Sequence, residues 1–274
     1  MINNTITIHD NQAFESMRKS GKLAAEILDF ITPHIVPGIT TERIDKLCYD
    51  YHIANNAIPG PLGYRGFPKS ICTSINHVVC HGIPGDRILK DGDIINIDVS
   101  PILDGWYGDT SRMFFVGNVK IKGQRLVNIT YEAMFEGIKA VRPGATLGDI
   151  GYSIQNFVEN QGFSVVRDFC GHGIGQTFHC PPNVMHYGNK GEGLVLKEGM
   201  IFTFAPRTFF LGSMHTIGRL FPRGDRAPSI EPIAEKKLWN LLDEDGRLSQ
   251  WSRGRAERVK SGFYISQACE LVRC

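Results

Sequence analysis

The sequence has 274 residues, of which 42% are hydrophobic and 21% are charged, and its formal net charge is +2. A chain of this length can bury a core without disulfides, and its small net charge gives no reason to expect nucleic-acid specificity or a membrane surface. No apolar run reaches the ~18 residues of a membrane span, and residues 1–10 are polar without a signal pattern. We therefore expect a cytoplasmic protein whose widely spaced cysteines are free thiols.

The predicted elements follow the order helix, helix, strands twice. Apolar residues at helical spacing predict a helix over residues 14–31, and Thr40 is the expected N-cap of a second helix. Runs rich in β-branched residues then predict strands at residues 70–76, 78–80, 94–99 and 112–116. The second set has helices at residues 124–141 and 147–160 and strands at residues 164–167 and 200–204.

The sequence also repeats internally. Residues 36–40 (VPGIT) recur as 142–146 (RPGAT), and residues 89–98 (LKDGDIINID) recur as 196–205 (LKEGMIFTFA). The repeat predicts a single domain, 1–274, with two pseudo-symmetric halves at about 14–120 and 121–206 and a divergent tail, 207–274. The repeat aligns Asp98 with position 205. If strand ends from both halves converge on one site, a carboxylate is expected at position 205. The sequence has Ala205 there.

Two aspartates are candidate metal ligands. In the strand 94–99, alternation places Asn96 and Asp98 on the face opposite Ile95, Ile97 and Val99. Asp109 follows the turn GWYG, which is expected to return it beside Asp98. Two neighbouring carboxylates repel each other unless a cation or a proton lies between them. The alternative is a solvated strand aspartate and an ordinary turn aspartate.

Three histidines lie in or near glycine-rich turns. His172 is in GHGIG, His179 follows it, and His81 is in CHGIP. A single histidine is more often structural. Three of them together with two aspartates supply imidazole and oxygen ligands without thiolate, a set that suits Mn, Fe, Co or Zn. Two such ions bridged by carboxylates can activate water for hydrolysis.

Several motifs occur in one specific order. They are FPKSICTSIN at 67–76, VVCHGIP at 78–84, DIINID at 93–98, GWYGDTSR at 105–112 and GHGIG at 171–175. In this order they resemble the type I methionine aminopeptidases, in the short bacterial form. The resemblance runs from about residue 14 to residue 203. It implies the pita-bread fold, an α/β (α+β) architecture with two pseudo-symmetric halves.

The resemblance implies three kinds of site residue. The implied metal ligands are Asp98, Asp109 and His172. The implied catalytic residues, which also contact the substrate, are His81 and His179. The implied binding pocket for the methionine side chain comprises Tyr64, Phe67, Cys72 and Phe178. A soft, aromatic-lined pocket of this kind suits a thioether.

The implied activity is metal-dependent removal of the N-terminal methionine from nascent proteins. Divalent ions, Co, Mn, Fe or Zn and two per site in the family, are implied because free water is too weakly acidic at neutral pH. The implied partners are peptide or nascent-protein N-termini, met in passing at the ribosome. The protein is expected to be a monomer.

The last quarter departs from the family pattern. The family strand ends in Thr-x-Glu-Pro, whereas residues 203–206 read TFAP, and alanine can neither bind a metal nor accept a proton. The family's closing segment, similar to SAQFEH, corresponds to LSQWSR at 248–253, which has no carboxylate. Two implied ligands are therefore missing, and a single ion or none is the alternative to two.

Three interpretations of this departure stay open. Glu231, in the segment SIEPI, fills the missing role if residues 204–228 are an insertion. A second interpretation is that the tail, 207–274, is translated out of frame. Otherwise, the chain is a non-catalytic pita-bread protein that binds peptides or a partner, the alternative to an aminopeptidase of impaired activity. A small-molecule hydrolase is disfavoured by the Cys72 pocket.

Overall fold

The computed structural model describes residues 5–204, 206, 208–210 and 270–271. The α-helices are α1 (Asn11–Ile31), α2 (Thr41–Ala54), α3 (Ile121–Ala140) and α4 (Leu147–Asn160), and the short 3₁₀ helices are η1 (Thr32–His34) and η2 (Tyr64–Gly66). The strands of residues 58–115 are β1 (Ile58–Pro59), β2 (Cys72–Ile75), β3 (Ile94–Val99), β4 (Pro101–Leu103), β5 (Trp106–Tyr107) and β6 (Thr110–Phe115). The later strands are β7 (Phe163–Val165), β8 (Gly171–Gly173), β9 (Cys180–Val184), β10 (Ile201–Phe202), β11 (Thr208–Phe210) and β12 (Glu270–Leu271).

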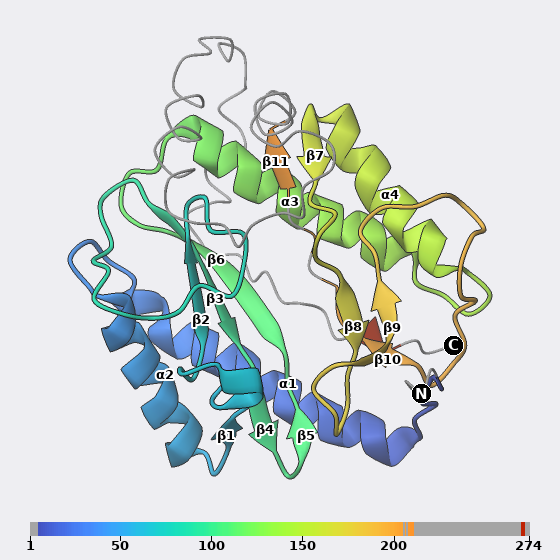
Figure 1. The fold of residues 1–274 in the computed structure, drawn as a ribbon, viewed down its shortest axis with the longest axis horizontal. Coiled ribbons are helices and arrows are strands. Elements are labelled where there is room, and N and C mark those ends of the chain that lie inside the picture. The colour runs from blue at the N-terminus through green and yellow to red at the C-terminus, as the bar shows by residue number, and fades with distance from the viewer. Residues whose placement is uncertain (1–4, 205, 207, 211–269, 272–274) are drawn as a thin grey trace.

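The first half packs α1 and α2 against the antiparallel sheet β2–β3–β6 (Figure 1). Its core joins apolar side chains of α1, such as Ile27, to Ile95 and Ile97 of β3, all of them fully buried. Because side chains alternate along a strand, this packing leaves Asp98 on the other face of β3. The helices thus fix the sheet from one side and leave its opposite face to the site.

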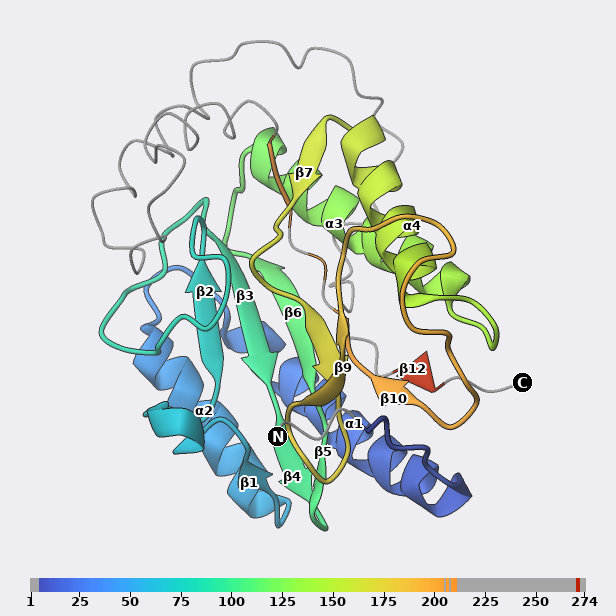
Figure 2. The ribbon, with the colours of Figure 1, turned by 45° about the vertical axis from the view of Figure 1, so that its right-hand side comes forward.

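The second half packs α3 and α4 against each other and beside the strands β7 to β10. The antiparallel sheet has the order β12–β10–β8–β9, and β7 pairs with β11. Phe202 and Phe204 are fully buried in the core of this half, together with Ile154 of α4. In the turned view, as in Figure 1, the strands lie between α1 and α2 of the first half and α3 and α4 of the second (Figure 2).

The sequence repeat corresponds to a repeated set of contacts. The amide of Gly38 donates to the carbonyl oxygen of Leu89 at 2.8 Å, and the amide of Gly144 donates to that of Leu196 at 3.0 Å. In each half the next threonine caps a helix through its side chain, which accepts a hydrogen bond from the third residue of that helix. The repeated residues therefore have equivalent roles in both halves, as the sequence predicted.

Most predicted elements are confirmed within a few residues of their ends, and β3 and α4 begin and end where they were predicted. The strand predicted at residues 78–80 is wrong. Asn76 has a left-handed backbone (φ 54°), and the amide of Val78 donates to the carbonyl oxygen of Ile75 at 3.0 Å. This turn ends β2, because a strand cannot continue through a left-handed residue. In the part of the chain described, no helix is long and apolar enough to cross a membrane.

Candidate metal and peptide site

Asp98 lies near the end of β3, between two neighbouring strands. Its register partners are Cys72 on β2 and Ser111 on β6. Directly opposite residues of antiparallel strands have their Cβ atoms about 4.5–5.5 Å apart. The half-buried Asp98 carboxylate and the buried Cys72 thiol therefore lie side by side on one face of the sheet.

Asp109 immediately precedes β6 and is only 5% exposed. It is two residues before Ser111, the partner of Asp98, so both aspartates are on the same face. The hydroxyl of Ser100 donates to Oδ1 of Asp109 at 3.2 Å. A Cβ atom on the preceding residue, Gly108, would lie 2.4 Å from the carbonyl oxygen of Ser20. Only glycine lets α1 approach the backbone this closely, and this approach fixes Asp109.

His172 is in the middle of β8, which lies between β9 and β10. A Cβ atom on Gly171 would lie 1.9 Å from the carbonyl oxygen of Thr203, and one on Gly173 would lie 2.2 Å from that of Pro181. The two glycines of GHG are therefore required by the close approach of both neighbouring strands. His172 lies between these glycines, so its backbone is held in place by both neighbouring strands.

One contact between the two halves is formed by His172 and Asp109. Nδ1 of His172 donates to the carbonyl oxygen of Gly173 at 3.0 Å, and Nε2 lies 3.5 Å from Oδ2 of Asp109. Burial lowers the pKa of His172, but the hydrogen bond and charge of Asp109, with smaller contributions from Gly173 and Asp98, raise it above its ordinary value. The Nδ1 bond to a backbone carbonyl leaves Nε2 as the nitrogen that faces the carboxylates, an arrangement typical of metal-binding histidines.

A stack of rings adjoins this contact. The His179 ring lies 4.1 Å from that of His172, 4.3 Å from that of Phe178 and 5.2 Å from that of Tyr64 between centroids. Although His179 is exposed on one side, its partial removal from water by these rings, followed by the charge of His172, lowers its pKa to about 4. His179 is therefore a neutral imidazole at neutral pH.

His81 lies in the loop after β2 and has a left-handed backbone (φ 56°). A Cβ atom on the next residue, Gly82, would lie 2.1 Å from the carbonyl oxygen of Thr73, and the amide of Gly82 is 3.2 Å from the hydroxyl of Ser74. The loop is thus held against β2. His81 itself is exposed, and its charge contributes to lowering the pKa of His179.

The predicted pocket residues are only partly brought together. Tyr64 and Phe178 are in ring contact, with centroids 5.0 Å apart. The half-buried Phe67 is tied to the same turn by its amide, which donates to the carbonyl oxygen of Tyr64 at 3.0 Å. Among the described residues, no ring contact joins Phe67 to the stack. Cys72 is placed beside Asp98 instead.

Three residues that adjoin the predicted site were missed from the sequence. They are Tyr107, which stacks on Phe178 with centroids 4.8 Å apart, Ser100, which binds Asp109, and Phe169, whose ring edge lies 5.9 Å from His81. Tyr107 lies inside the motif GWYGD, two residues before Asp109, so its position in the motif was a usable signal. The other two carry no distinguishing local pattern.

The predicted ligands have the donor types that a divalent ion prefers, namely two carboxylates and one imidazole nitrogen. Within the described residues, however, no group of three His, Cys, Asp or Glu side chains is arranged so that it could hold a metal ion. The predicted next ligand position, Ala205, and the alternative ligand, Glu231, lie outside the described residues. The donor chemistry thus fits a metal, whereas the described part of the chain holds only part of a ligand set.

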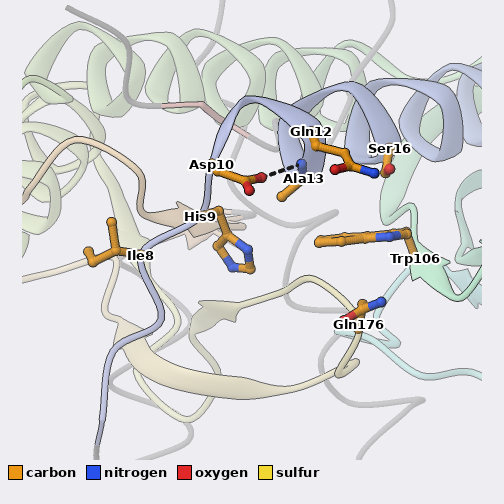
Figure 3. A pocket seen from close by; sticks show the side chains of 8 residues that line it. All are labelled: Ile8, His9, Asp10, Gln12, Ala13, Ser16, Trp106 and Gln176. Atoms are coloured by element: carbon orange, nitrogen blue, oxygen red, sulfur yellow. Dashed lines mark hydrogen bonds between the residues drawn. The ribbon is translucent and has the colours of Figure 1, made fainter.

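A cavity of the described part of the chain lies outside the predicted site. It has a volume of about 400 Å³ and is lined by Ile8, His9, Asp10, Gln12, Ala13, Ser16, Trp106 and Gln176 (Figure 3). None of these is a predicted site residue. Asp10 uses its side chain to accept a hydrogen bond from the amide of Ala13, so it caps α1. Trp106 connects this cavity to the predicted site, because it also packs against the apolar cluster that contains Phe178.

Known proteins match this chain over most of its length. Metallopeptidase family M24 matches residues 15–231. The chain is 62% identical to a methionine aminopeptidase of Rickettsia prowazekii over 261 residues, which is 95% of either chain. It belongs to the methionine aminopeptidases of family M24. Another methionine aminopeptidase, from Escherichia coli strain K12, is 52% identical over 203 residues, 73% of this chain and 77% of the relative.

Solved structures agree with this membership. The crystal structure of the Rickettsia prowazekii methionine aminopeptidase has a TM-score of 0.73 and 55% identity, and the match covers 76% of this chain and 91% of that one. A prolidase from Pyrococcus furiosus has a TM-score of 0.62 at 22% identity, over 73% of this chain and 57% of that one, and shares the fold alone. The predicted pita-bread fold of the methionine aminopeptidases is thus confirmed.

The tail has two further matches. The C-terminal family of magnesium-protoporphyrin IX methyltransferase matches residues 193–273, less than half of the chain. The match to the Rickettsia methionine aminopeptidase also extends beyond residue 206, whereas the Escherichia coli match is shorter. Most of the tail lies outside the described residues. The out-of-frame interpretation of residues 207–274 stays a prediction.

Proposed function

We propose that this protein removes the N-terminal methionine from peptides and new proteins by hydrolysing the first peptide bond. The observation that carries the proposal is the contact of Asp109 with His172, directly beside the ring stack of Tyr64, Phe178 and His179. Relatives at 62% and 52% identity that are named methionine aminopeptidases favour an enzyme over a non-catalytic binding protein.

Asp98, Asp109 and His172 are the residues that would hold the divalent metal that family M24 uses. A bound divalent metal supplies Lewis-acid activation of water and of the peptide carbonyl group. The protein's contribution is to fix these side chains. Asp109 is held by Ser100 and by the close approach of α1, and His172 is held by the glycines on either side of it. A ligand that is oriented before binding does not lose conformational freedom when the metal arrives.

The methionine side chain is proposed to bind against Tyr64, Phe67, Cys72 and Phe178. The edge-to-face contact of Tyr64 and Phe178 and the stacking of Tyr107 on Phe178 make a rigid aromatic wall. A thioether is polarisable and makes favourable contacts with aromatic edges. Tyr107 extends the predicted pocket and orients the ring of Phe178, which is buried between Tyr64 and Tyr107.

His179 and His81 are proposed to contact the peptide at the bond that is cleaved. A neutral His179 can donate a hydrogen bond to the peptide carbonyl oxygen as negative charge develops there. Its lowered pKa, which follows from burial and from the charge of His172, keeps a positive charge off this ring at neutral pH. His81 is held by the loop against β2 and is exposed, so it can reach a peptide from solvent.

The proposal also covers the native metal, the natural substrates and the place of action. The native metal is proposed to be Mn, Fe, Co or Zn. Because position 205 is alanine in the sequence, we infer fewer than two tightly bound ions and low turnover. The natural substrates are inferred to be nascent chains met at the ribosome, and the protein is inferred to act in the cytoplasm as a monomer.

The test is methionine release from Met-Ala-Ser in Mn²⁺ or Co²⁺, followed by mass spectrometry. We expect release that depends on metal and is lost in His172→Ala, at a rate far below that of the Escherichia coli relative measured in parallel. His34→Ala is the matched control, because His34 is in η1 and touches no site residue among its described contacts. Absence of release at every metal concentration would reject the proposed activity, and release at the relative's rate would reject the inferred impairment.

A further inference from the structure

Arg65 has an unusual backbone for its residue type. It lies inside η2 with φ 49° and ψ 31°, in the left-handed region, between Gly63 (φ 79°) and Gly66 (φ 85°). Glycine adopts this region freely, whereas a residue with a Cβ atom does so at a cost. Such a conformation persists only where the surrounding structure enforces it, and residues of this kind concentrate at binding sites.

This backbone places the guanidinium group of Arg65 over the Tyr64 ring, 5.3 Å from its centroid. The other neighbour of that ring is His179, with centroids 5.2 Å apart and planes at 23°. The Arg65 cation and the site imidazole therefore both lie against the same aromatic ring. Its charge reaches the site, since it is one of the causes that lower the pKa of His179, after burial and other charges.

The Arg65 cation is exposed and has no ion pair with any carboxylate among the described residues. Lys69, four positions further along the same segment, differs in this respect because its amine is paired with the carboxylate of Glu42. A guanidinium group has five N–H donors in a planar fork that matches a carboxylate. Held against Tyr64, it has already lost part of its conformational freedom before any ligand binds.

We propose that Arg65 is a specificity-determining residue that binds a carboxylate in the peptide segment that follows the N-terminal methionine. The inference rests on the proposed function, because a methionine side chain seated against Tyr64 and Phe178 directs the following residues past His179. The carboxylate comes either from an acidic side chain or from the free C-terminus of a short peptide. Both sources present the same group to the same cation.

The experiment compares dissociation constants, measured by calorimetry, for three peptides. Met-Ala-Glu-Ser amide carries a side-chain carboxylate, Met-Ala-Gln-Ser with a free C-terminus carries a terminal one, and Met-Ala-Gln-Ser amide carries neither. We expect the Glu peptide, the free-terminus peptide or both to bind about two- to fivefold more tightly than the neutral peptide, the range of an exposed ion pair. The preference should shrink as salt is raised.

Four variants separate the effect of the Arg65 charge from other effects of a substitution. Arg65→Gln is expected to bind all three peptides equally, Arg65→Lys to keep part of the preference, and Lys69→Gln to behave as the wild type. Arg65→Gly suits the left-handed backbone and removes the side chain, so it is expected to match Arg65→Gln while keeping the thermal midpoint of the wild type. A wild type without the preference, or Arg65→Gln with it, would overturn the inference.

Methionine release from the same peptides is recorded separately. Arg65-dependent binding without release contradicts the proposed function but supports the role of Arg65. Equal binding and equal release across the three peptides support the proposed function and reject the role of Arg65.

Discussion

Nε2 of His172 lies 3.5 Å from Oδ2 of Asp109, and this contact joins the second half of the chain to the first. His172 is in β8 and Asp109 immediately precedes β6, and Gly108, Gly171 and Gly173 let these segments approach their neighbours closely. The site therefore depends on how the halves meet.

Replacement of Asp109 by asparagine is expected to lower metal affinity by at least about tenfold, because even residues that only orient metal ligands contribute that much. The amide keeps the size of the side chain and its hydrogen bond from Ser100 but removes the negative charge. Manganese titration by calorimetry measures the loss. Asp104→Asn is the matched control, since Asp104 is an exposed residue of the β4–β5 turn with a left-handed backbone that asparagine tolerates. Equal affinities in both variants would remove Asp109 from the ligand set.

Glutamate in place of Ala205 is expected to raise metal affinity by about tenfold or more. The reason is the sequence repeat, which aligns position 205 with Asp98. Ala205→Gln, which adds a side chain of the same length without the charge, is the control, and both are measured by manganese titration and by methionine release. If Ala205→Glu binds no more tightly, while Glu231→Gln loses the affinity of the wild type, the carboxylate comes from Glu231 instead.

Truncation of Phe178 to alanine is expected to raise KM for methionine peptides and to destabilise the fold by about 3–5 kcal/mol. Phe178 is 8% exposed and contacts Tyr64, Tyr107 and His179. Phe178→Leu keeps most of the buried volume and separates the two effects, because it should retain stability but lose the stacking on Tyr107. Peptide kinetics and urea unfolding provide the two measurements. An unchanged KM in both variants would place methionine elsewhere.

Alanine at Gly171 is expected to displace β8 from β10, since its Cβ atom would lie 1.9 Å from the carbonyl oxygen of Thr203. We expect loss of methionine release together with a destabilisation of more than about 1 kcal/mol, as for other overpacked positions. Gly21→Ala is the opposite case. Gly21 lies within α1 with no atom in reach of an added Cβ atom, so this variant should gain about 0.4–1 kcal/mol. A Gly171→Ala protein with wild-type melting and release would show that β8 can move away without cost.

His52 is expected to make the fold labile in mild acid. It is fully buried in α2, its Nδ1 donates to the carbonyl oxygen of Cys48 at 2.7 Å, and its Nε2 has no hydrogen-bond partner among the described residues. Burial, opposed by the bond to Cys48 and the charge of Asp45, lowers its pKa.

The sign of the effect follows from this lowered pKa. Above the ordinary histidine pKa of about 6.5, neither state binds the proton and His52 adds no pH dependence. Below it the unfolded state binds the proton first, so the free energy of unfolding decreases as the pH is lowered. For one group the decrease is at most about 1.4 kcal/mol per pH unit. Urea unfolding between pH 5 and pH 7 should show a smaller slope in His52→Gln than in the wild type. His34→Gln, which alters a half-buried histidine of η1 and leaves His52 in place, is the control.

Much of the fold could be predicted from short windows of sequence. Helix caps at Thr40 and Thr146, the apolar alternation of β3 and the paired PG turns depend on residues a few positions apart, so local physics determines them. The same alternation placed Asp98 on the face opposite the core. The repeat by itself also identifies Ala205 as a departure, because two halves with matching turns require matching strand ends.

Other features were decided only by tertiary packing. The stacking of Tyr107 on Phe178, the position of Phe169 beside His81 and the placement of Arg65 over Tyr64 next to His179 join rings and charges that are mostly far apart in the chain. No periodicity encodes such contacts, since they depend on the angle at which the two halves pack. The sequence by itself therefore determined the family, the four α-helices and several strands such as β3, and it supplied the candidate ligands. The tertiary structure decided which side chains surround them.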